Sequence, residues 1–389
     1  MKLNGIRVLD LSRFLPGPHL AMMMSDHGAD VIKVEDIIYG DPTRNIGPKE
    51  GGVSVYFRNT NRGKRSLAIN LKNEEGRKIF IELAKTADVI LETFRPGVVD
   101  RLGIGYSTIR TVAPQVVYCS ISAFGQSGSY KDSPAHDLSV NALSGVLSMS
   151  KNEDGEPSIP CLPPSDLAGS LMALSGILMA LFRRQETGKG DYLDMSMYDA
   201  VFSWTPHIIG KVFSEDKAPD PSTERTQGGS AFYGVYQTAD KKWITLGGSE
   251  IKFVENFLIA MDRQDLISCG KLPPGCQQKP LKKYLKETFM TKTQKEWINW
   301  FQGKDICFAP VFNMKEAMDI PQLNDREMII QDNDGNRQLG VPIKFEDEPA
   351  SPSMHAPRLG ENTADILREI GYNKNFVAEM EKEKIIVLG

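Results

Sequence analysis

Between about residue 6 and residue 123 the chain alternates short β-branched runs with segments whose apolar residues recur at helical spacing. The β-branched runs are RVLDLS, DVIKVE, SLAINLK, DVILET and VVYCSIS, and the helical segment NEEGRKIFIELAKT lies between the third and the fourth. Such alternation favours a parallel sheet with helices on both of its faces. We therefore predict an α/β fold built on a Rossmann-like, doubly wound parallel sheet.

Ligands of open parallel sheets bind beyond the carboxyl ends of the strands. In this chain the loops expected there are LSRFLPGPHL, VEDIIYGDPTR, ETFRPGVVDRLG and SAFGQSG. The first of them lacks the G-x-G-x-x-G pattern of dinucleotide-binding turns, so a nicotinamide cofactor is not expected. These loops are where we expect the functional site.

A second, smaller domain is expected after a change of composition. From Asp166 a long apolar segment reads as a helix that stops at Gly188, and residues 210–228 then become rich in Lys, Asp, Pro, Ser and Thr, as in a linker. A hairpin around Ala239–Lys241 and three helical segments follow, so we predict a small α+β domain over 225–320. An amphipathic segment near the C-terminus should pack back on the first unit, which gives a large domain of 1–215 plus 325–389.

Charge, cysteines and hydropathy exclude several other classes of protein. The formal net charge is −4 with no long basic run, so nucleic acid is not the expected partner. Five scattered cysteines without metal-ligand spacing are typical of reduced thiols, and no metal site is predicted. The N-terminus shows no signal segment, and the apolar stretch LMALSGILMALF is too short to span a bilayer. We expect a cytoplasmic protein with no membrane partner.

Three acidic or imidazole side chains are candidates for chemistry, and each has an ordinary structural alternative. In SPAHDLSVNALSG, Asp137 is a good helix N-cap and His136 could simply form a hydrogen bond near a helix start. Asp166 opens a long helix, where capping is common but where amides also stabilise a carboxylate or an oxyanion. Glu250 in TLGGSEIKF could serve the next helix by its charge alone.

Two groups of basic residues precede or follow neighbouring strands. Lys64 and Arg65, with Arg62 beside them, lie before SLAINLK, and a solvated charge run is the usual explanation for such a cluster. Arg95 and Arg101 lie in the next loop. Two basic groups at adjacent strand ends make a phosphate-bearing ligand more plausible than either group alone.

Many motifs of the chain, in their order, resemble the family III coenzyme A transferases of CaiB/BaiF type. They include LNGIRVLDLSRFLPGPHLAMMMSDHGADVIKVE, NRGKRSLAINLK, DVILETFRPGVVDRLGIGY, AHDLSVNALSGVLS and the segment from Asp166 through TGKGDYLDMSMYDA. Within that family the His-Asp pair, the PGP turn at 16–18, and GGSAFY followed by LGGSE resemble the α-methylacyl-CoA racemase branch.

The resemblance implies catalytic roles for His136, Asp166 and Glu250. In the racemase branch the first two stand on opposite faces of the substrate α-carbon, and the third holds the imidazole. The implied reaction is racemisation of a 2-methylacyl-CoA, or a related α-substituted acyl-CoA, by removal and return of the α-proton through an enolate. Donors for the enolate oxygen are expected from backbone amides near Asp137 or at the start of the Asp166 helix.

Two other functions stay open. In the transferase branch the carboxylate at the position of Asp166 attacks the thioester, forms a mixed anhydride and then an aspartyl-CoA thioester, and so moves CoA between carboxylic acids. A non-catalytic acyl-CoA binding protein is the third possibility, against which the presence of all three candidate catalytic residues argues.

The resemblance also implies where coenzyme A lies, as part of the substrate and not as a bound cofactor. Its expected contacts are Lys64, Arg65, Ala68, Ile69, Asn70, Leu71, Thr93, Phe94, Arg95, Arg101, Ala135 and Asp137. Relatives often carry an arginine after the KVE-like strand, where this chain has Asp36. The contact that this arginine makes with the adenosine phosphate is therefore not expected here, unless Arg44 or Lys64 replaces the arginine. Family members form dimers of interlocked chains, so an interlocked homodimer is expected here.

Overall fold

The computed structural model describes residues 1–152 and 154–389 and divides into two compact units. The first unit comprises 1–144, 160–204 and 322–389, and the second comprises 145–159 and 205–321. Relative to the predicted domains, the second unit begins earlier, at residue 205, and includes a segment that precedes the Asp166 helix. The predicted linker at 210–228 contains a short helix, α9 (Gly210–Glu215).

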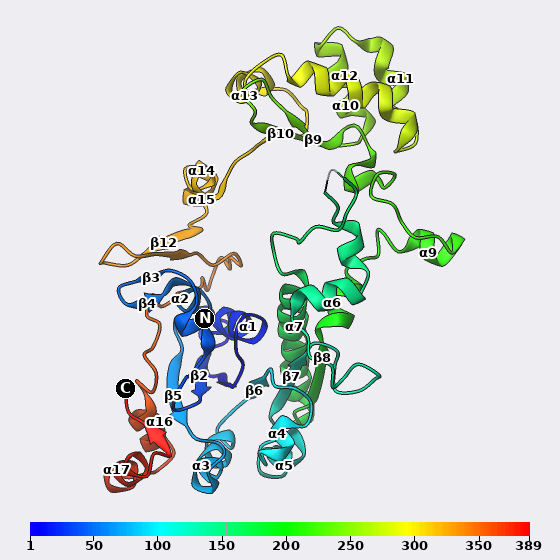
Figure 1. Ribbon diagram of the computed structural model, residues 1–389. Coiled ribbons are helices and arrows are strands. Elements are labelled where there is room, and N and C mark those ends of the chain that lie inside the picture. Colours follow the sequence, from blue (N-terminus) through cyan, green and yellow to red (C-terminus); the bar gives the residue numbers. More distant parts are fainter. Residues whose placement is uncertain (153) are drawn as a thin grey trace. The chain divides into compact units, whose positions relative to one another are not determined.

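The first unit is built on a seven-stranded sheet with the order β14-β5-β2-β1-β6-β7-β8 (Figure 1). All its strands run parallel except β14, which is antiparallel to β5. Without β14, the strands stand in the order third, second, first, fourth, fifth, sixth along the chain, as in doubly wound nucleotide-binding folds. Their bounds are β1 (Arg7–Asp10), β2 (Asp30–Glu35), β5 (Arg65–Ile69), β6 (Val89–Glu92), β7 (Val117–Ser122), β8 (Tyr192–Ser196) and β14 (Ile386–Val387).

Helices cover both faces of this sheet, because successive strand side chains point to opposite sides. Alternate residues such as Leu9, Ile32 and Ile90 pack into a core with one set of helices, α3 (Glu74–Ala84), α5 (Tyr106–Val112), α16 (Thr363–Glu369) and α17 (Lys374–Lys382). The opposite face receives α1 (Pro16–Asp26) and α7 (Pro164–Thr187), which contact each other and the strands. The α/β class predicted from the sequence is thereby confirmed.

The C-terminal segment returns to the first unit, as the amphipathic pattern predicted. Ile366 and Leu367 of α16 are fully buried in the core beside β5. The last strand, β14, then pairs its Ile386 and Val387 with Ile69 and Ala68, which closes that edge of the sheet. The sequence analysis did not predict this strand, because two residues carry no readable period.

Among the described residues α7 is the longest helix; it begins at Pro164, two residues before the predicted start, and ends at Thr187, where Gly188 is a left-handed cap at φ 65°. By length and composition it would suffice to cross a membrane, although core helices of other proteins pass the same test. Its buried residues include Ala168, Ala173 and Ile177. The long helix predicted from Asp166 to a stop at Gly188 is thus confirmed, and part of it packs on the sheet.

The second unit is a small α+β body, as predicted. Its sheet has the order β11-β10-β9 and is antiparallel, with Thr238 to Lys242 forming the expected hairpin turn. Phe257, Phe289 and Trp297 form its aromatic core. The main elements are β9 (Tyr233–Gln237), β10 (Trp243–Gly247), β11 (Phe308–Val311), α10 (Ile251–Ala260), α12 (Lys279–Phe289) and α13 (Gln294–Phe301).

Candidate active site

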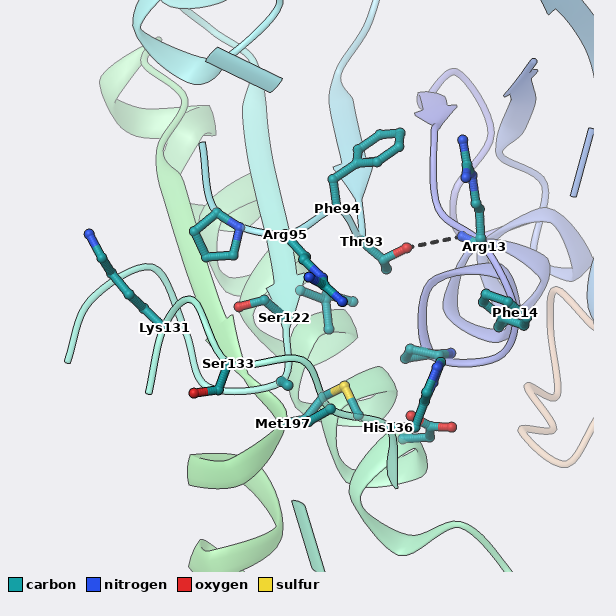
Figure 2. A pocket seen from close by; sticks show the side chains of 16 residues that line it. Arg13, Phe14, Thr93, Phe94, Arg95, Ser122, Lys131, Ser133, His136 and Met197 are labelled. Carbon is teal, nitrogen blue, oxygen red and sulfur yellow. Dashed lines mark hydrogen bonds between the residues drawn. The ribbon is translucent and has the colours of Figure 1, made fainter. Parts of the chain in front are cut away.

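A cavity of about 220 Å³ opens at the carboxyl edge of the parallel sheet, where β1 and β6 are neighbours. Chain connections leave β1 and β6 in opposite directions along the sheet, so this is the switch point at which doubly wound folds bind their ligands. All of its lining residues belong to the first unit. They are Arg13, Phe14, Pro16, Thr93, Phe94, Arg95, Pro96, Ile121, Ser122, Ala123, Lys131, Ser133, Ala135, His136, Asp166 and Met197 (Figure 2).

His136 and Asp166 therefore meet at one cavity, although 30 positions separate them in sequence. His136 precedes α6 (Asp137–Leu143), and its side chain makes no capping hydrogen bond. The imidazole is exposed and stands edge-on to the ring of Phe14, with centroids 5.9 Å apart and planes at 83°. The capping alternative for the His136 side chain is thus not what the structure shows.

Asp166 lies in the first turn of α7, and its carboxyl group is partly buried. Burial and the nearby charge of Asp137 raise the pKa of Asp166 to about 7. Protonated and ionised forms are then both populated near neutral pH, which suits a group that gives and takes a proton.

Asp137 fixes the position of Asp166. One of its carboxylate oxygens accepts from the amide of Ser165 at 2.8 Å, from the Ser165 hydroxyl at 2.6 Å and from the amide of Asp166 at 3.2 Å. The other oxygen accepts from the Asn141 side chain at 2.7 Å. Asp137 thus caps α7 from 28 residues away in sequence, a role that replaces the predicted capping of its own helix.

This arrangement corrects one prediction for the enolate donors. The amides of Ser165 and Asp166 already donate to Asp137, and the amide of Leu167 donates to the carbonyl of Pro163 at 3.1 Å. The start of α7 therefore has no free donor among these three. The backbone around Ala135, which lines the cavity, is the remaining candidate.

The loop after β6 forms a second wall. Thr93, Phe94 and Arg95 line the cavity as the resemblance implied, and Arg95 is exposed (Figure 2). Beneath them Glu92 is buried and accepts the amide of Phe94 at 2.6 Å. Burial raises the pKa of Glu92 to about 7. Arg101 lines an adjoining cavity of about 520 Å³, which shares Pro96 and Lys131 with the first.

Lys64 has a structural role in place of the predicted contact with coenzyme A. Its ammonium group is fully buried and donates to the Asp10 carboxylate, the Pro18 carbonyl and the Asn61 side chain, at 2.8 to 2.9 Å. An ammonium group has three protons, so all of its donors are occupied. Lys64 therefore has no free proton to donate to coenzyme A, contrary to the prediction.

Arg65 also lies away from the cavity. It is the first residue of β5, and its guanidinium pairs with Asp30, the first residue of β2, and with Glu369. The starts of parallel strands share one edge of the sheet, opposite to the edge that carries the cavity. This placement corrects the prediction that Arg65 contacts coenzyme A, and Arg62 beside it is buried against Asp26.

The predicted main-chain contacts of Ala68 to Leu71 meet the C-terminal segment. Ala68 and Ile69 pair with β14, the amide of Ala68 donates to Thr363, and the amide of Asn70 donates to the carbonyl of Ile385. Of these four predicted contacts, at least the amides of Ala68 and Asn70 already have acceptors within the chain. Ile69 and Leu71 do not line the cavity.

The resemblance implies an arginine at the position of Asp36, and the two cations suggested in its place are not free. Asp36 accepts the amides of Ile38 and Tyr39 in a turn after β2. Arg44 is bound by both oxygens of Glu35 and donates to the carbonyl of Pro357. Both cations suggested as replacements, Arg44 and Lys64, are therefore already paired.

Glu250 lies in the second unit, at the N-cap position of α10, where its side chain makes no capping hydrogen bond. Its predicted contact with His136 stays a prediction. Conversely, the sequence analysis did not single out Arg13, Phe14, Lys131 or Met197 as site residues, although Arg13 and Phe14 stand in a loop that it marked for ligand binding.

The fold and the cavity define an α/β protein with a candidate ligand site at the switch point of a parallel sheet, lined by a histidine and an aspartate. The model of CoA-transferase family III matches residues 3–363, and the chain belongs to this family. It is an enzyme that acts on acyl-CoA.

Curated relatives carry different activities at similar identity. The chain is 33% identical to the acetyl-CoA:oxalate CoA-transferase of Acetobacter aceti over 376 residues, 94% of this chain and 95% of the relative. It is 32% identical to human alpha-methylacyl-CoA racemase over 395 residues, 99% and 98% of the two chains. A crystal structure of a CAIB/BAIF family protein from Brucella suis matches with a TM-score of 0.81 and 27% identity, covering 95% of this chain and 99% of that one.

Proposed function

We propose that the enzyme racemises an α-substituted acyl-CoA, such as a 2-methylacyl-CoA. The observation that carries this proposal is that His136 and Asp166 line one cavity. Racemisation needs a base that removes the α-proton from one face and an acid that returns a proton to the other. An imidazole and a carboxyl group that line the same cavity can provide both, and the human racemase among the relatives supports the same chemistry.

The protonation of Asp166 suits this scheme. Because the pKa of Asp166 is about 7, the group exists in both forms at neutral pH and can act as the base in one direction and the acid in the other. As the α-proton leaves, charge builds on the thioester oxygen and must be stabilised by donors already in place. The backbone near Ala135 is the proposed source of these donors, since the first amides of α7 are bound to Asp137.

Coenzyme A itself would extend away from the cavity, which has room for the acyl and thioester end. We propose that Thr93, Phe94 and Arg95 meet the pantetheine and that Arg101 meets a phosphate in the adjoining cavity. Phosphate groups attract arginine because the guanidinium fork matches their oxygens.

CoA transfer between carboxylic acids is the second candidate, and the transferases among the relatives favour it. In that scheme the Asp166 carboxylate attacks the thioester carbonyl, and the CoA thiolate leaves as a mixed anhydride forms. The thiolate then attacks the Asp166 carbonyl, which releases the first acid and gives an aspartyl-CoA thioester. An acceptor carboxylate takes the CoA through the same two steps in reverse.

One experiment separates the two reactions. A panel of acyl-CoAs is incubated with enzyme in deuterated water, with and without free carboxylic acids, and the products are weighed by mass spectrometry. The proposal expects one deuterium at the α-carbon without any acceptor, and the transferase scheme expects CoA on the added acid instead. Wild-type enzyme that labels no branched acyl-CoA would contradict racemisation.

Variants at the two side chains sharpen the result. His136→Ala should lower α-proton exchange by about 10²-fold to 10⁴-fold, the usual contribution of a positioned acid or base, yet leave most of any CoA transfer. Asp166→Asn should abolish both reactions. Hydroxylamine should displace CoA from an enzyme-bound thioester and leave a hydroxamate at Asp166 of wild-type enzyme only if CoA transfer occurs. His355→Ala is the matched control, because His355 is exposed on the surface and pairs with Glu361.

We further propose that the protein is a cytoplasmic homodimer of interlocked chains. Exposed apolar side chains of α7 support a second copy as the partner, above all Met179 and Phe182, which are 70% and 73% exposed. Large exposed apolar groups gathered on one helix are typical of an interface. Light scattering on purified protein tests the dimer, which a monomer at micromolar concentration would contradict.

A further inference from the structure

Phe14 lines the candidate active site with an unusual backbone conformation. Its φ is 64°, in the left-handed region that a bulky L residue rarely adopts. Such conformations persist only where the surrounding structure holds them, and they concentrate at functional sites. The question is what holds Phe14 in this conformation and what its ring does there.

A buried ionic network holds the chain on the N-terminal side of Phe14. The amide of Ser12 donates to the Asp10 carboxylate at 2.9 Å, and the Ser12 hydroxyl donates to the same oxygen. The ammonium group of Lys33 donates to the carbonyl of Ser12 at 3.0 Å and pairs with Asp41 at 2.9 Å. All four side chains are at most 2% exposed, so this anchor does not exchange with water.

Two further hydrogen bonds fix the chain on either side of Phe14. On the N-terminal side, the amide of Arg13 donates to the Thr93 hydroxyl at 3.0 Å, which ties the turn to the loop after β6 (Figure 2). On the C-terminal side, four residues past Phe14, the carbonyl of Pro18 accepts from the buried Lys64 at 2.9 Å. Helix α1 begins between these two anchors, at Pro16. The turn therefore has little freedom to relax to a negative φ at Phe14.

The constrained turn presents the Phe14 ring to His136. The two rings meet edge to face, with centroids 5.9 Å apart and an interplanar angle of 83°. This is the geometry that aromatic rings favour, because the positive edge of one lies against the negative face of the other. His136 has no side-chain capping bond that would orient its imidazole otherwise.

We propose that Phe14 is a positioning residue for His136: the strained turn holds its ring so that the imidazole faces the reacting carbon. The inference rests on the proposed role of His136 in proton transfer and adds a residue that orients it. A general base gains most from fixed geometry, because small misplacements of a reacting group lower the rate strongly.

Three substitutions at position 14 test this. Phe14→Leu keeps apolar bulk and removes the ring, Phe14→Tyr keeps the ring, and Phe14→Gly removes the ring but accepts a positive φ without strain. The full-length enzyme is labelled with ¹³C at the histidine ring carbons, and the His136 signal is assigned from its loss in His136→Gln. Phe14→Leu and Phe14→Gly should move the His136 signal, because the ring current of Phe14 is gone, while Phe14→Tyr should leave it near its place.

Kinetic measurements then show whether Phe14 positions His136 or only lines the cavity. For Phe14→Leu we expect kcat for α-proton exchange to fall by about tenfold to a hundredfold with KM for acyl-CoA nearly unchanged, and Phe14→Tyr should restore it. Phe14→Gly should show a similar loss with a melting temperature at or above that of Phe14→Leu, so that the loss does not come from unfolding.

Two results would overturn the inference: a His136 signal that stays in place in Phe14→Leu, or a rise in KM with kcat unchanged. Failure of the proposed function looks different. If wild-type enzyme exchanged no α-proton, racemisation would be refuted, while the position of the His136 signal in the three variants would still show whether the Phe14 ring lies against the imidazole.

Discussion

From the contact between Asp137 and the start of α7 we predict how the pH dependence of the enzyme changes when the negative charge of Asp137 is removed. Asp137→Asn keeps an oxygen that accepts the amides of Ser165 and Asp166, so the helix cap should survive. The substitution removes the negative charge that, after burial, is the second cause of the raised pKa of Asp166. The pKa of Asp166 should therefore fall.

The size of the fall is bounded by the structure. An aspartate normally ionises near pH 3.9, so a pKa of about 7 is a rise of about 3 units. Burial is the larger cause, which leaves Asp137 less than half of the rise, at most about 1.5 units or about 2 kcal/mol. Asp166 is partly exposed, and screening by solvent makes this figure an upper bound.

The raised pKa of Asp166 also makes the stability of the protein depend on pH. Because the pKa of folded Asp166 lies above its unfolded value, its contribution to stability is fully present below about pH 3.9 and is lost as the pH rises through about 7. The Asp137→Asn variant should lose less stability over this interval. The drop in its free energy of unfolding between pH 4 and a pH above 7 should therefore be smaller than the drop in wild type. Denaturant titrations at the two pH values measure the difference.

The decisive assay is the pH profile of kcat/KM for α-proton exchange, with a carboxyl NMR titration of Asp166 beside it. The limb that reports ionisation of Asp166 should move from about 7 toward about 5.5 in Asp137→Asn. Asp199→Asn, an exposed carboxylate of α8 (Met197–Ser203) that does not contribute to the pKa of Asp166, is the control and should leave the limb in place. A limb that stays near 7 in Asp137→Asn would refute the electrostatic reasoning.

Three further predictions concern stability and assembly. Lys64→Met should lower the free energy of unfolding by about 3–5 kcal/mol in denaturant titration, because Asp10 loses a buried partner at 2.8 Å, and adding Asp10→Asn should recover part of the loss. Gly17→Ala should lower both the rate of α-proton exchange and the melting temperature, because the new Cβ would lie 2.2 Å from the side chain of Ser12. Gly47→Ala is the control: its Cβ would meet open space, so it tests only the strain of a positive φ. Phe182→Glu should lower the melting temperature of the dimer, since Phe182 is 73% exposed on the single chain and interlocked chains separate only on unfolding; an unchanged melting temperature would show that the interface lies elsewhere.

Local patterns were enough to predict most of the elements of this chain. DVIKVE predicts a strand that the structure forms over the same six residues, β2, because β-branched side chains suit a sheet buried on both faces. The alternation of strands and helices also predicted the parallel sheet, since parallel neighbours need a crossover between them. The loops at the carboxyl ends of the strands, among them the Thr93 loop, were identified for the same reason, whereas His136 was identified from the His-Asp pair and the family resemblance.

The basic cluster at 62–65 shows where such reasoning fails. A run of cations in sequence is compatible with solvent, a phosphate or buried carboxylates, and the sequence does not say which. Here Arg62 pairs with Asp26, Lys64 with Asp10 and Arg65 with Asp30, each more than 30 positions away. Only the folded sheet brings these partners together.

The sequence by itself therefore determined the order of strands and helices, the edge at which the ligand site lies, and two of the side chains that meet there. Tertiary structure alone decided that Asp137 caps the helix of Asp166, that β14 covers the edge of β5, and that Phe14 stands against His136. The physical reason is the range of the signal. Hydrophobic period and turn chemistry act over a few neighbouring residues, whereas the pKa of a carboxyl group and the orientation of an imidazole depend on groups that only the fold places beside them.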